Sequence, residues 1–245
     1  MYDKKMQLWD KKSKTFPRYS EELSAVQKGA FAACKSWSVE FAGKSLIDIG
    51  CGTGVWTLHL AKMAKSVSAL DASQGMLEVL KEDASRLNLG NVSVINSNFE
   101  CFYKDFDKKN SDKFDIAFSS MSPALNKDED YKAFMALAPL RVFVGWEEYR
   151  QSDLLAPIFK AFNAKQKCFD DNDMENFLRK NKIEFKKKVF EETRHNEKPR
   201  EIAIENALWH LNMAGIEPSV DELDKLIKGD TIKEVVKSKI KLLVF

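Results

Sequence analysis

The stretch Leu46–Gly54, LIDIGCGTG, constrains the fold more than any other part of the sequence. Its first four residues are apolar except for Asp48, as in a short buried strand, and then Gly50, Gly52 and Gly54 stand at every second position. A helical pattern follows directly. Glycines between a strand and a helix permit a tight turn and let a ligand approach the backbone, where N–H groups at the helix start point outward. The stretch therefore predicts a strand, a ligand-binding turn and a helix.

An alternation of strands and helices continues from this stretch to the end of the chain. Strands are expected over residues 45–49, 66–70, 92–95, 114–119, 141–146, 183–191 and 239–245. Helical spacing of apolar residues is expected between most of them, over residues 55–64, 73–87, 128–138, 154–162 and 174–180. This pattern predicts an α/β fold with a doubly wound, mostly parallel seven-stranded sheet, in which ligands bind at the carboxyl ends of the strands.

Residues 195–234 interrupt the alternation just before the last strand. Two capping boxes, Ser219-x-x-Glu222 and Thr231-x-x-Glu234, mark expected helix starts in this segment. We therefore expect a helical insertion. The predicted organisation is an N-terminal arm and helix over residues 1–43, with a proposed role as a cover of the active site, a core over residues 44–194, the insertion over residues 195–234, and the last core strand over residues 235–245.

Asp71 ends the second predicted strand, 23 residues after Asp48. An acid at about this interval accepts hydrogen bonds from ribose hydroxyls in doubly wound folds. The dinucleotide fingerprint G-x-G-x-x-G is not matched, because Val55 and Thr57 stand in the region where its third glycine is needed. Asp48, an acid just before the loop, is better placed against a cationic group than against a pyrophosphate. The ligand expected here contains a nucleoside and a positive charge.

LIDIGCGTG followed by LDAS-x-x-ML resembles the class I S-adenosylmethionine-dependent methyltransferases, over roughly residues 44–148 and the closing strands. The resemblance implies that the glycines line the methionine end of S-adenosylmethionine, that Asp48 faces its ammonium, and that Asp71 takes the ribose hydroxyls. Asn98 stands where the family usually has an acid for the adenine amino group. The cofactor site predicted on this basis comprises Asp48, Gly50, Cys51, Gly52, Gly54, Asp71, Ala72, Ser73, Met76, Asn98, Phe99, Ser119 and Arg18, and the expected product is S-adenosylhomocysteine.

The methyl acceptor is less clearly indicated. In enzymes of this class that methylate planar amines, an Asn/Asp-Pro-Pro-aromatic motif often follows the fourth strand, whereas this chain has Ser119–Leu125, SSMSPAL. We therefore favour a small-molecule acceptor over a protein or RNA, with a non-catalytic cofactor-binding partner subunit as a further alternative. The N-terminal segment with Trp9 and Phe16–Tyr19 is expected to fold over the cofactor, where Arg18 could pair with the methionine carboxylate. The alternative is an aromatic arm packed on the sheet edge.

The remaining sequence features offer one candidate for an acid or base and argue against several classes of partner and location. His195, in the polar segment ETRHNEK, is the candidate for an acid or base, and the scattered cysteines and histidines show no metal-ligand spacing. The charges nearly cancel, to +2, which argues against nucleic acid as a partner. No apolar run reaches the length of a membrane span or a leader. A cytoplasmic protein is expected, and its oligomeric state is not predicted.

Overall fold

The computed structural model describes residues 2–108, 113–164 and 173–245. By its contacts the chain divides into two compact units. The core unit consists of Trp9–Gly145, Asp171–Val189 and Lys241–Phe245. The second unit consists of Met1–Leu8, Trp146–Asp170 and Phe190–Ile240. The boundary falls within three long strands and the first helix, so the two units share elements.

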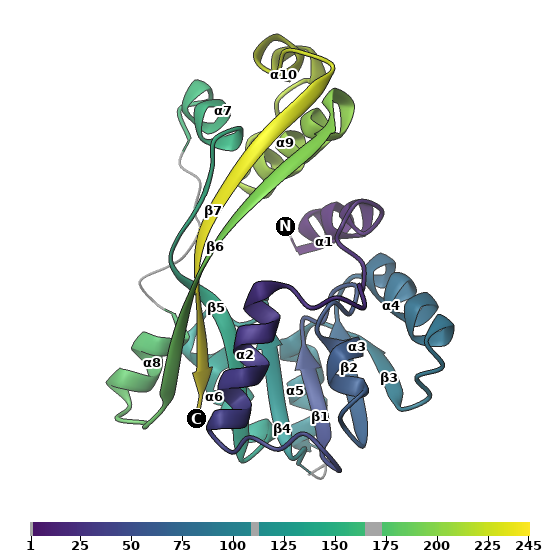
Figure 1. The fold of residues 1–245 in the computed structure, drawn as a ribbon, viewed down its shortest axis with the longest axis vertical. Coiled ribbons are helices and arrows are strands. Elements are labelled where there is room, and N and C mark those ends of the chain that lie inside the picture. The colour runs from purple at the N-terminus through teal and green to yellow at the C-terminus, as the bar shows by residue number, and fades with distance from the viewer. Residues whose placement is uncertain (1, 109–112, 165–172) are drawn as a thin grey trace. The chain divides into compact units, whose positions relative to one another are not determined.

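Seven strands of the described residues form one sheet in the order β3-β2-β1-β4-β5-β7-β6 (Figure 1). Four neighbouring pairs, among β1 to β5, are parallel. Arg141 and Phe245 exchange two backbone hydrogen bonds, of 2.9 and 3.1 Å, which is the pairing of an antiparallel last strand. The strands are β1 (Ser45–Ile49), β2 (Ser66–Asp71), β3 (Val92–Asn96), β4 (Ile116–Ser120), β5 (Leu140–Ser152), β6 (Lys186–Pro199) and β7 (Thr231–Val244). The predicted fold class is confirmed.

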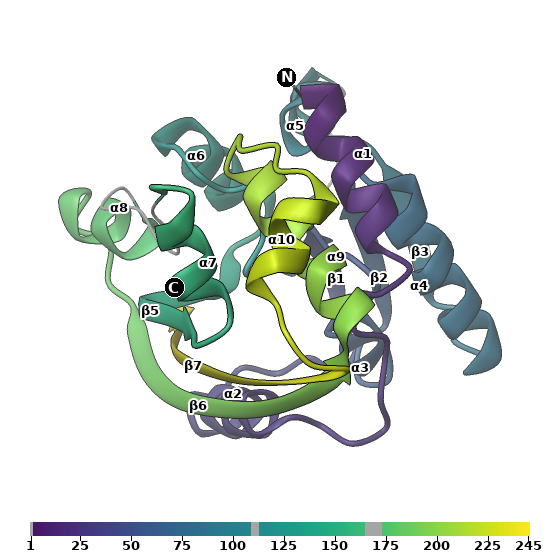
Figure 2. The ribbon, with the colours of Figure 1, turned by 90° about the horizontal axis from the view of Figure 1, so that it is seen from above.

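Helices cover both faces of the sheet in the core unit. Ile47 and Ile49 of β1 pack in one cluster with residues of α5, α6 and α8, while Ala69 of β2 packs with residues of α3 and α4 in another. Figure 2 shows α2 and α3 on the side of the sheet opposite α5 and α6. The helices are α2 (Ala25–Ser36), α3 (Thr57–Ala61), α4 (Gln74–Arg86), α5 (Phe99–Lys108), α6 (Asp128–Leu137) and α8 (Met174–Lys180).

The second unit has a separate apolar cluster. It is built from α7 (Leu155–Ala161), α9 (Arg200–Met213), α10 (Val220–Leu226) and the adjoining parts of the long strands. Ser152 of β5 donates to Glu234 of β7 (2.5 Å), and Lys198 of β6 pairs with the same carboxylate (2.7 Å), so one buried acid ties the three strands together. Residues 2–8 of α1 (Tyr2–Lys12) also belong to this unit.

Several predicted boundaries were wrong. β6 continues to Pro199, so His195 lies in a strand and not in the expected helical insertion. Thr231 begins β7 instead of capping a helix, because this segment pairs into the sheet, whereas the capping box at Ser219 is confirmed by reciprocal bonds with Glu222. Helices α1 and α5 were not predicted.

Candidate functional site

The three glycines of the turn after β1 all have positive φ, but they face different surroundings. A Cβ on Gly50 (φ +70°) would lie 1.8 Å from the Oγ of Ser122, and one on Gly54 (φ +83°) would lie 2.8 Å from Leu80. A Cβ on Gly52 (φ +55°) would meet only the ring of Phe16, at 3.9 Å. Gly50 and Gly54 are thus explained by packing within the protein. Gly52 is the position where the backbone is open to a ligand.

Asp71, at the end of β2, organises this turn. One of its carboxylate oxygens accepts from the N–H of Gly52 (2.9 Å), and the other accepts from the N–H of Ser73 (2.8 Å). Each oxygen has a second lone pair that can accept a ligand hydroxyl. Burial raises the pKa of Asp71 above its ordinary value, while the N–H groups of Ser73 and Gly52 oppose the shift. The turn therefore presents an acceptor group next to its open glycine.

Asp48 lies behind the turn, in the middle of the sheet. It is 2% exposed and accepts a hydrogen bond of 2.6 Å from the hydroxyl of Thr57, the first residue of α3. Burial raises its pKa to about 7, the Thr57 bond opposes this, and the charge of Asp71 adds to it. Among the described residues, no lysine, arginine or histidine forms an ion pair with it.

Other predicted site residues are engaged within the protein. The carbonyl oxygen of the Asn98 side chain accepts from the N–H of Cys101 (2.8 Å) at the start of α5, and Phe99 is buried in the core cluster. Ser119 is completely buried and donates to the carbonyl of Ile49 (3.0 Å), which is the structural role of a strand hydroxyl. Met76 is buried in α4. Cofactor contacts of Asn98, Phe99, Ser119 and Met76 stay predictions.

Ala72, Ser73 and Cys51 lie at or near the turn. Ser73, a residue type that is typical of helix N-caps, caps α4 by accepting from the N–H of Met76 (3.2 Å). Cys51 is buried, and burial raises the pKa of its thiol well above the ordinary value, so the thiol is neutral. Ala72 follows Asp71 directly and is partly exposed. Of the four cysteines, Cys168 lies outside the described residues.

Arg18 has a different partner from the one that the sequence suggested. Its guanidinium forms two hydrogen bonds with Asp83 of α4, of 2.8 and 3.1 Å, and an ion pair with Glu82. Asp83 is almost fully buried, so this bidentate pair is part of the fold. We therefore leave Arg18 out of the proposed cofactor site.

The N-terminal segment and α2 are bound to the residues at and just after the glycine turn. The hydroxyl of Thr53 donates to the carbonyl of Pro17 (2.6 Å), and the amide of Gln27 in α2 donates to the carbonyl of Val55 (3.0 Å). The sequence analysis did not identify Asp10, whose carboxylate accepts from the hydroxyl of Ser73 (2.6 Å). Nor did it identify Thr57 and Ser122 as partners of Asp48 and Gly50. No local pattern marks these three residues, because each contacts a distant segment.

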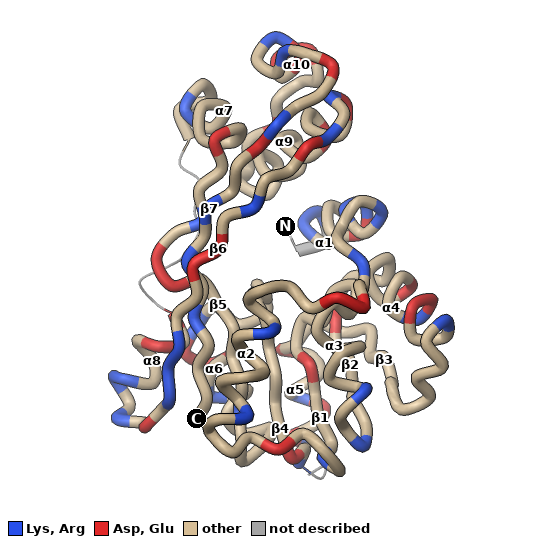
Figure 3. The backbone as a smooth tube through the Cα atoms, in the orientation of Figure 1, with Lys and Arg blue, Asp and Glu red and all other residues tan. Residues whose placement is uncertain are grey.

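The remaining predictions concern His195, the distribution of charges, metal sites and membrane-spanning helices. His195 is exposed on β6, and we do not propose it as a catalytic acid or base. Lys and Arg are interspersed with Asp and Glu along the chain (Figure 3). Within the residues that the structure describes, no three His, Cys, Asp or Glu side chains are arranged to hold a metal ion, and no helix has the length and apolarity needed to cross a membrane.

Comparisons with known proteins concern the same part of the chain. Residues 46–139 match the family described as "Methyltransferase domain". The chain is 33% identical over 84 residues to the "Probable cobalt-precorrin-6B C(15)-methyltransferase (decarboxylating)" of Methanocaldococcus jannaschii, which covers 34% of this chain and 42% of the relative. It is 47% identical over 45 residues to the mitochondrial ubiquinone biosynthesis O-methyltransferase of Schizosaccharomyces pombe, covering 18% of this chain and 16% of the relative. The chain thus spans less than half the length of these curated relatives.

A likeness to solved structures extends over more of the chain. The YcgJ protein of Bacillus subtilis is 13% identical, with a TM-score of 0.50, and the match covers 88% of this chain and 98% of that protein. At this identity the likeness concerns the fold alone.

Proposed function

We propose that this chain is a class I S-adenosylmethionine-dependent methyltransferase that transfers a methyl group to a small-molecule acceptor, and the match of residues 46–139 to the family described as "Methyltransferase domain" supports this proposal. The observation that carries this proposal is the pairing of Gly52 with Asp71. A glycine open to a ligand donates its N–H to a partly buried carboxylate that still has lone pairs for hydroxyl groups. The positive φ of Gly52 by itself favours glycine, and it is the acceptor group beside the open side of this glycine that supports a bound ligand.

The residues present fit the cofactor at three points. Asp71 would accept from the ribose hydroxyls, the backbone at Gly52 would lie against the ligand, and Asp48 would offset the ammonium of the methionine group. When bound, the cofactor supplies a methyl group on a sulfonium that an acceptor atom can attack in line, with S-adenosylhomocysteine as the leaving product. The protein's own contribution is to hold both partners in line and to keep water away.

The loop after β4 supports a small acceptor. The contact between Ser122 and Gly50 places this loop beside the glycine turn, and Met121 holds a positive φ of +50° at its start. The Ser122 hydroxyl accepts from the N–H of Ala124 (3.1 Å) and so organises the loop itself. The loop's one amide side chain, Asn126, donates to the carbonyl of Pro123 (2.7 Å) within the loop, and residues 121–127 include no aromatic side chain that could stack on a planar amine. It is therefore unlike the loops that act on bases or glutamine.

The second unit is proposed to carry acceptor recognition. One face of α9 packs in the apolar cluster of this unit through Ala203, Ala207 and Leu211, and the other carries Trp209, whose indole N–H donates to the carbonyl of Leu8 (3.0 Å). Trp209→Ala should lower turnover at least tenfold while changing the affinity for S-adenosylhomocysteine less than twofold. Equal losses in both, or no loss of turnover, would contradict this role.

The proposed function is tested by calorimetry with S-adenosylhomocysteine and by methyl transfer from labelled S-adenosylmethionine. Asp71→Ala leaves ribose hydroxyls without an acceptor and should cost about 2 kcal/mol of binding, roughly a thirtyfold weaker affinity. Incubation with the small-molecule fraction of a cell extract should yield S-adenosylhomocysteine, whereas the macromolecular fraction should not. A wild-type protein that binds NAD and not S-adenosylhomocysteine would overturn the proposal. Methyl incorporation into protein or RNA alone would overturn the small-molecule acceptor.

A further inference from the structure

A segment of the N-terminal arm runs across both helices that flank the glycine turn. We call residues 9–21 the strap. At one end the strap contacts α4, where Asp10 accepts from the hydroxyl of Ser73 (2.6 Å) and from the N–H of Gly75 (3.0 Å). At the other end it contacts α3, where Lys62 donates to the hydroxyl of Tyr19 (2.6 Å) and to the carboxylate of Glu21 (2.9 Å). The strap is therefore held on both sides of the turn.

The contact of Asp10 belongs to a closed series of contacts that includes the predicted ribose acceptor. Asp10 holds the hydroxyl of Ser73, and the N–H of Ser73 is bound by Asp71. Asp71 in turn holds the N–H of Gly52, and the next residue, Thr53, binds the carbonyl of Pro17 in the strap. The series begins and ends in the strap, and Asp71 and Gly52 lie inside it. Loss of one link loosens the rest.

The surroundings of Gly75 show independently that the strap packs closely on α4. A Cβ at this position would lie 2.8 Å from the Oγ of Ser13 and 3.1 Å from the carbonyl oxygen of Asp10. Glycine within a helix lowers its stability by about 1 kcal/mol relative to alanine. Here it permits the backbone of the strap to approach the helix. The Asp10 carboxylate also meets the positive end of the α4 dipole, which favours an anion.

We propose that Asp10 is a positioning residue for the cofactor, acting through Ser73 and Asp71. Asp10 holds the strap in place, and the strap carries Phe16 to the open side of Gly52. The ribose acceptor Asp71 and the ring of Phe16 are thereby positioned by the same contacts. This inference rests on the proposed function and deepens it. It predicts that cofactor binding and closure of the strap stabilise one another.

The test measures the affinity of the full chain for S-adenosylhomocysteine by calorimetry, together with trypsin cleavage at the lysines and arginine of the strap. Asp10→Ala should weaken the affinity about tenfold, and S-adenosylhomocysteine should no longer slow cleavage of the strap. Asp10→Asn keeps an oxygen that can accept from Ser73 and Gly75, so its affinity should stay within about threefold of the wild type. Gln7→Ala, an exposed change in α1 outside the strap that removes no trypsin site, is the control and should change neither readout.

Gly75→Ala separates positioning from stability. Alanine has a higher helix propensity than glycine, so the substitution should not destabilise α4 itself. The added Cβ, however, should displace the strap from α4. We expect the affinity to fall at least fivefold. Unchanged affinity in both Asp10→Ala and Gly75→Ala, with faster cleavage of the strap, would overturn the inference and leave the proposed function intact. A wild-type chain that does not bind S-adenosylhomocysteine would overturn both.

Discussion

Two buried carboxylates, Asp48 behind the glycine turn and Glu175 on α8, have opposite electrostatic surroundings. Asp48 receives one hydroxyl hydrogen bond, from Thr57, and burial raises its pKa to about 7. Glu175 accepts from Lys187 (2.8 Å) and Arg179 (2.7 Å), and Lys241 lies 3.4 Å away. Burial opposes the ionisation of Glu175, but the bonds from Lys187 and Arg179 and the charge of Lys241 lower its pKa to about 2.

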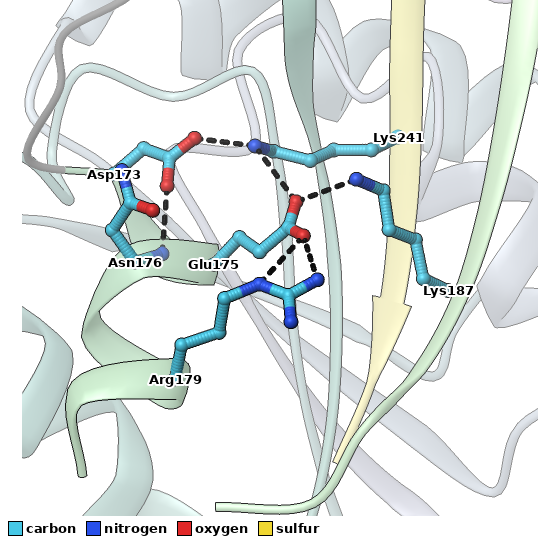
Figure 4. Close-up of polar contacts among 6 residues, drawn as sticks. All are labelled: Asp173, Glu175, Asn176, Arg179, Lys187 and Lys241. Atoms are coloured by element: carbon cyan, nitrogen blue, oxygen red, sulfur yellow. Dashed lines mark hydrogen bonds and ion pairs between the residues drawn. The ribbon is translucent and has the colours of Figure 1, made fainter. Parts of the chain in front are cut away.

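The Glu175 cluster joins three elements of the core unit. Figure 4 shows Lys241 from β7 and Lys187 from β6 pointing toward Glu175 and Asp173 at the start of α8. Lys241 is buried and also pairs with Asp173, which caps α8 through the N–H of Asn176 (2.9 Å). Charges of both signs are matched within the protein. This cluster holds α8 on the last two strands and needs no ligand.

The presence or absence of cations from the protein distinguishes buried acids with a structural role from buried acids that bind a ligand. A buried acid whose cations come from the protein is complete, whereas one without a protein cation is poised to take the cation of a ligand. Asp48 belongs to the second kind, which agrees with its proposed role toward the ammonium of the cofactor. Four experiments test this distinction, from the largest expected effect to the smallest.

Lys241→Met should give the largest effect, and it should affect stability only. Removing the buried cation leaves Asp173 and Glu175 undercompensated, which should cost about 3 kcal/mol in the free energy of unfolding. Urea denaturation measures this as a lower midpoint. Lys237→Met, an exposed change on the same strand, should cost little. A weaker affinity of the Lys241 variant for S-adenosylhomocysteine would break the comparison, since it would make this cluster part of the site.

Gly52→Val should have the converse effect. The side chain occupies the open side of the turn, so the affinity for S-adenosylhomocysteine should fall at least a hundredfold, about 2.7 kcal/mol. Gly43→Val is the matched control, because Gly43 also has a positive φ (+72°) and no atom lies within 4 Å of its expected Cβ. Both variants should show a similar loss of stability from backbone strain. Wild-type affinity in the Gly52 variant would show that the ligand binds elsewhere.

The two acids should also give opposite dependences of stability on pH. The folded-state pKa of Asp48 lies above its ordinary value of 3.8, so its contribution is full below that pH and is lost as the pH rises through about 7. The folded-state pKa of Glu175 lies below its ordinary value of 4.5, so its contribution is full above that pH and is lost as the pH falls through about 2. Asp48→Asn should remove the loss of stability as the pH rises toward 7, and Glu175→Gln should remove the loss of stability as the pH falls toward 2. Unaltered unfolding profiles in both variants would contradict these assignments.

The smallest effect concerns protons released on binding. An ammonium beside Asp48 favours its charged form, so binding S-adenosylhomocysteine near pH 6 should release up to about one proton per molecule. Calorimetry in two buffers of different ionisation enthalpy measures this number. Asp48→Asn should release fewer protons. Equal release by the wild type and this variant would remove Asp48 from the ammonium site.

Much of the fold could be predicted from local patterns. Strand β1 was predicted with the bounds that the structure shows, and Ser73 caps α4 as its position before the helical spacing suggested. These features depend on residues close together in the chain. The error at Thr231 was different, because the buried positions that alternate along β7 from Ile232 to Ile240 include Glu234 and Ser238, so the sequence itself shows no alternation of apolar residues there.

The sequence by itself therefore determined the succession of strands along the chain, the glycine turn and the two acids at its edges, since each follows from periodicity or from a short motif. Only the tertiary structure decided that Ser122 fills the space beside Gly50, that Asp10 reaches the start of α4, and that Lys187 binds Glu175. These contacts join segments that are far apart in the chain. Their formation depends on how the packed helices and strands bring side chains together, and no local pattern carries that information.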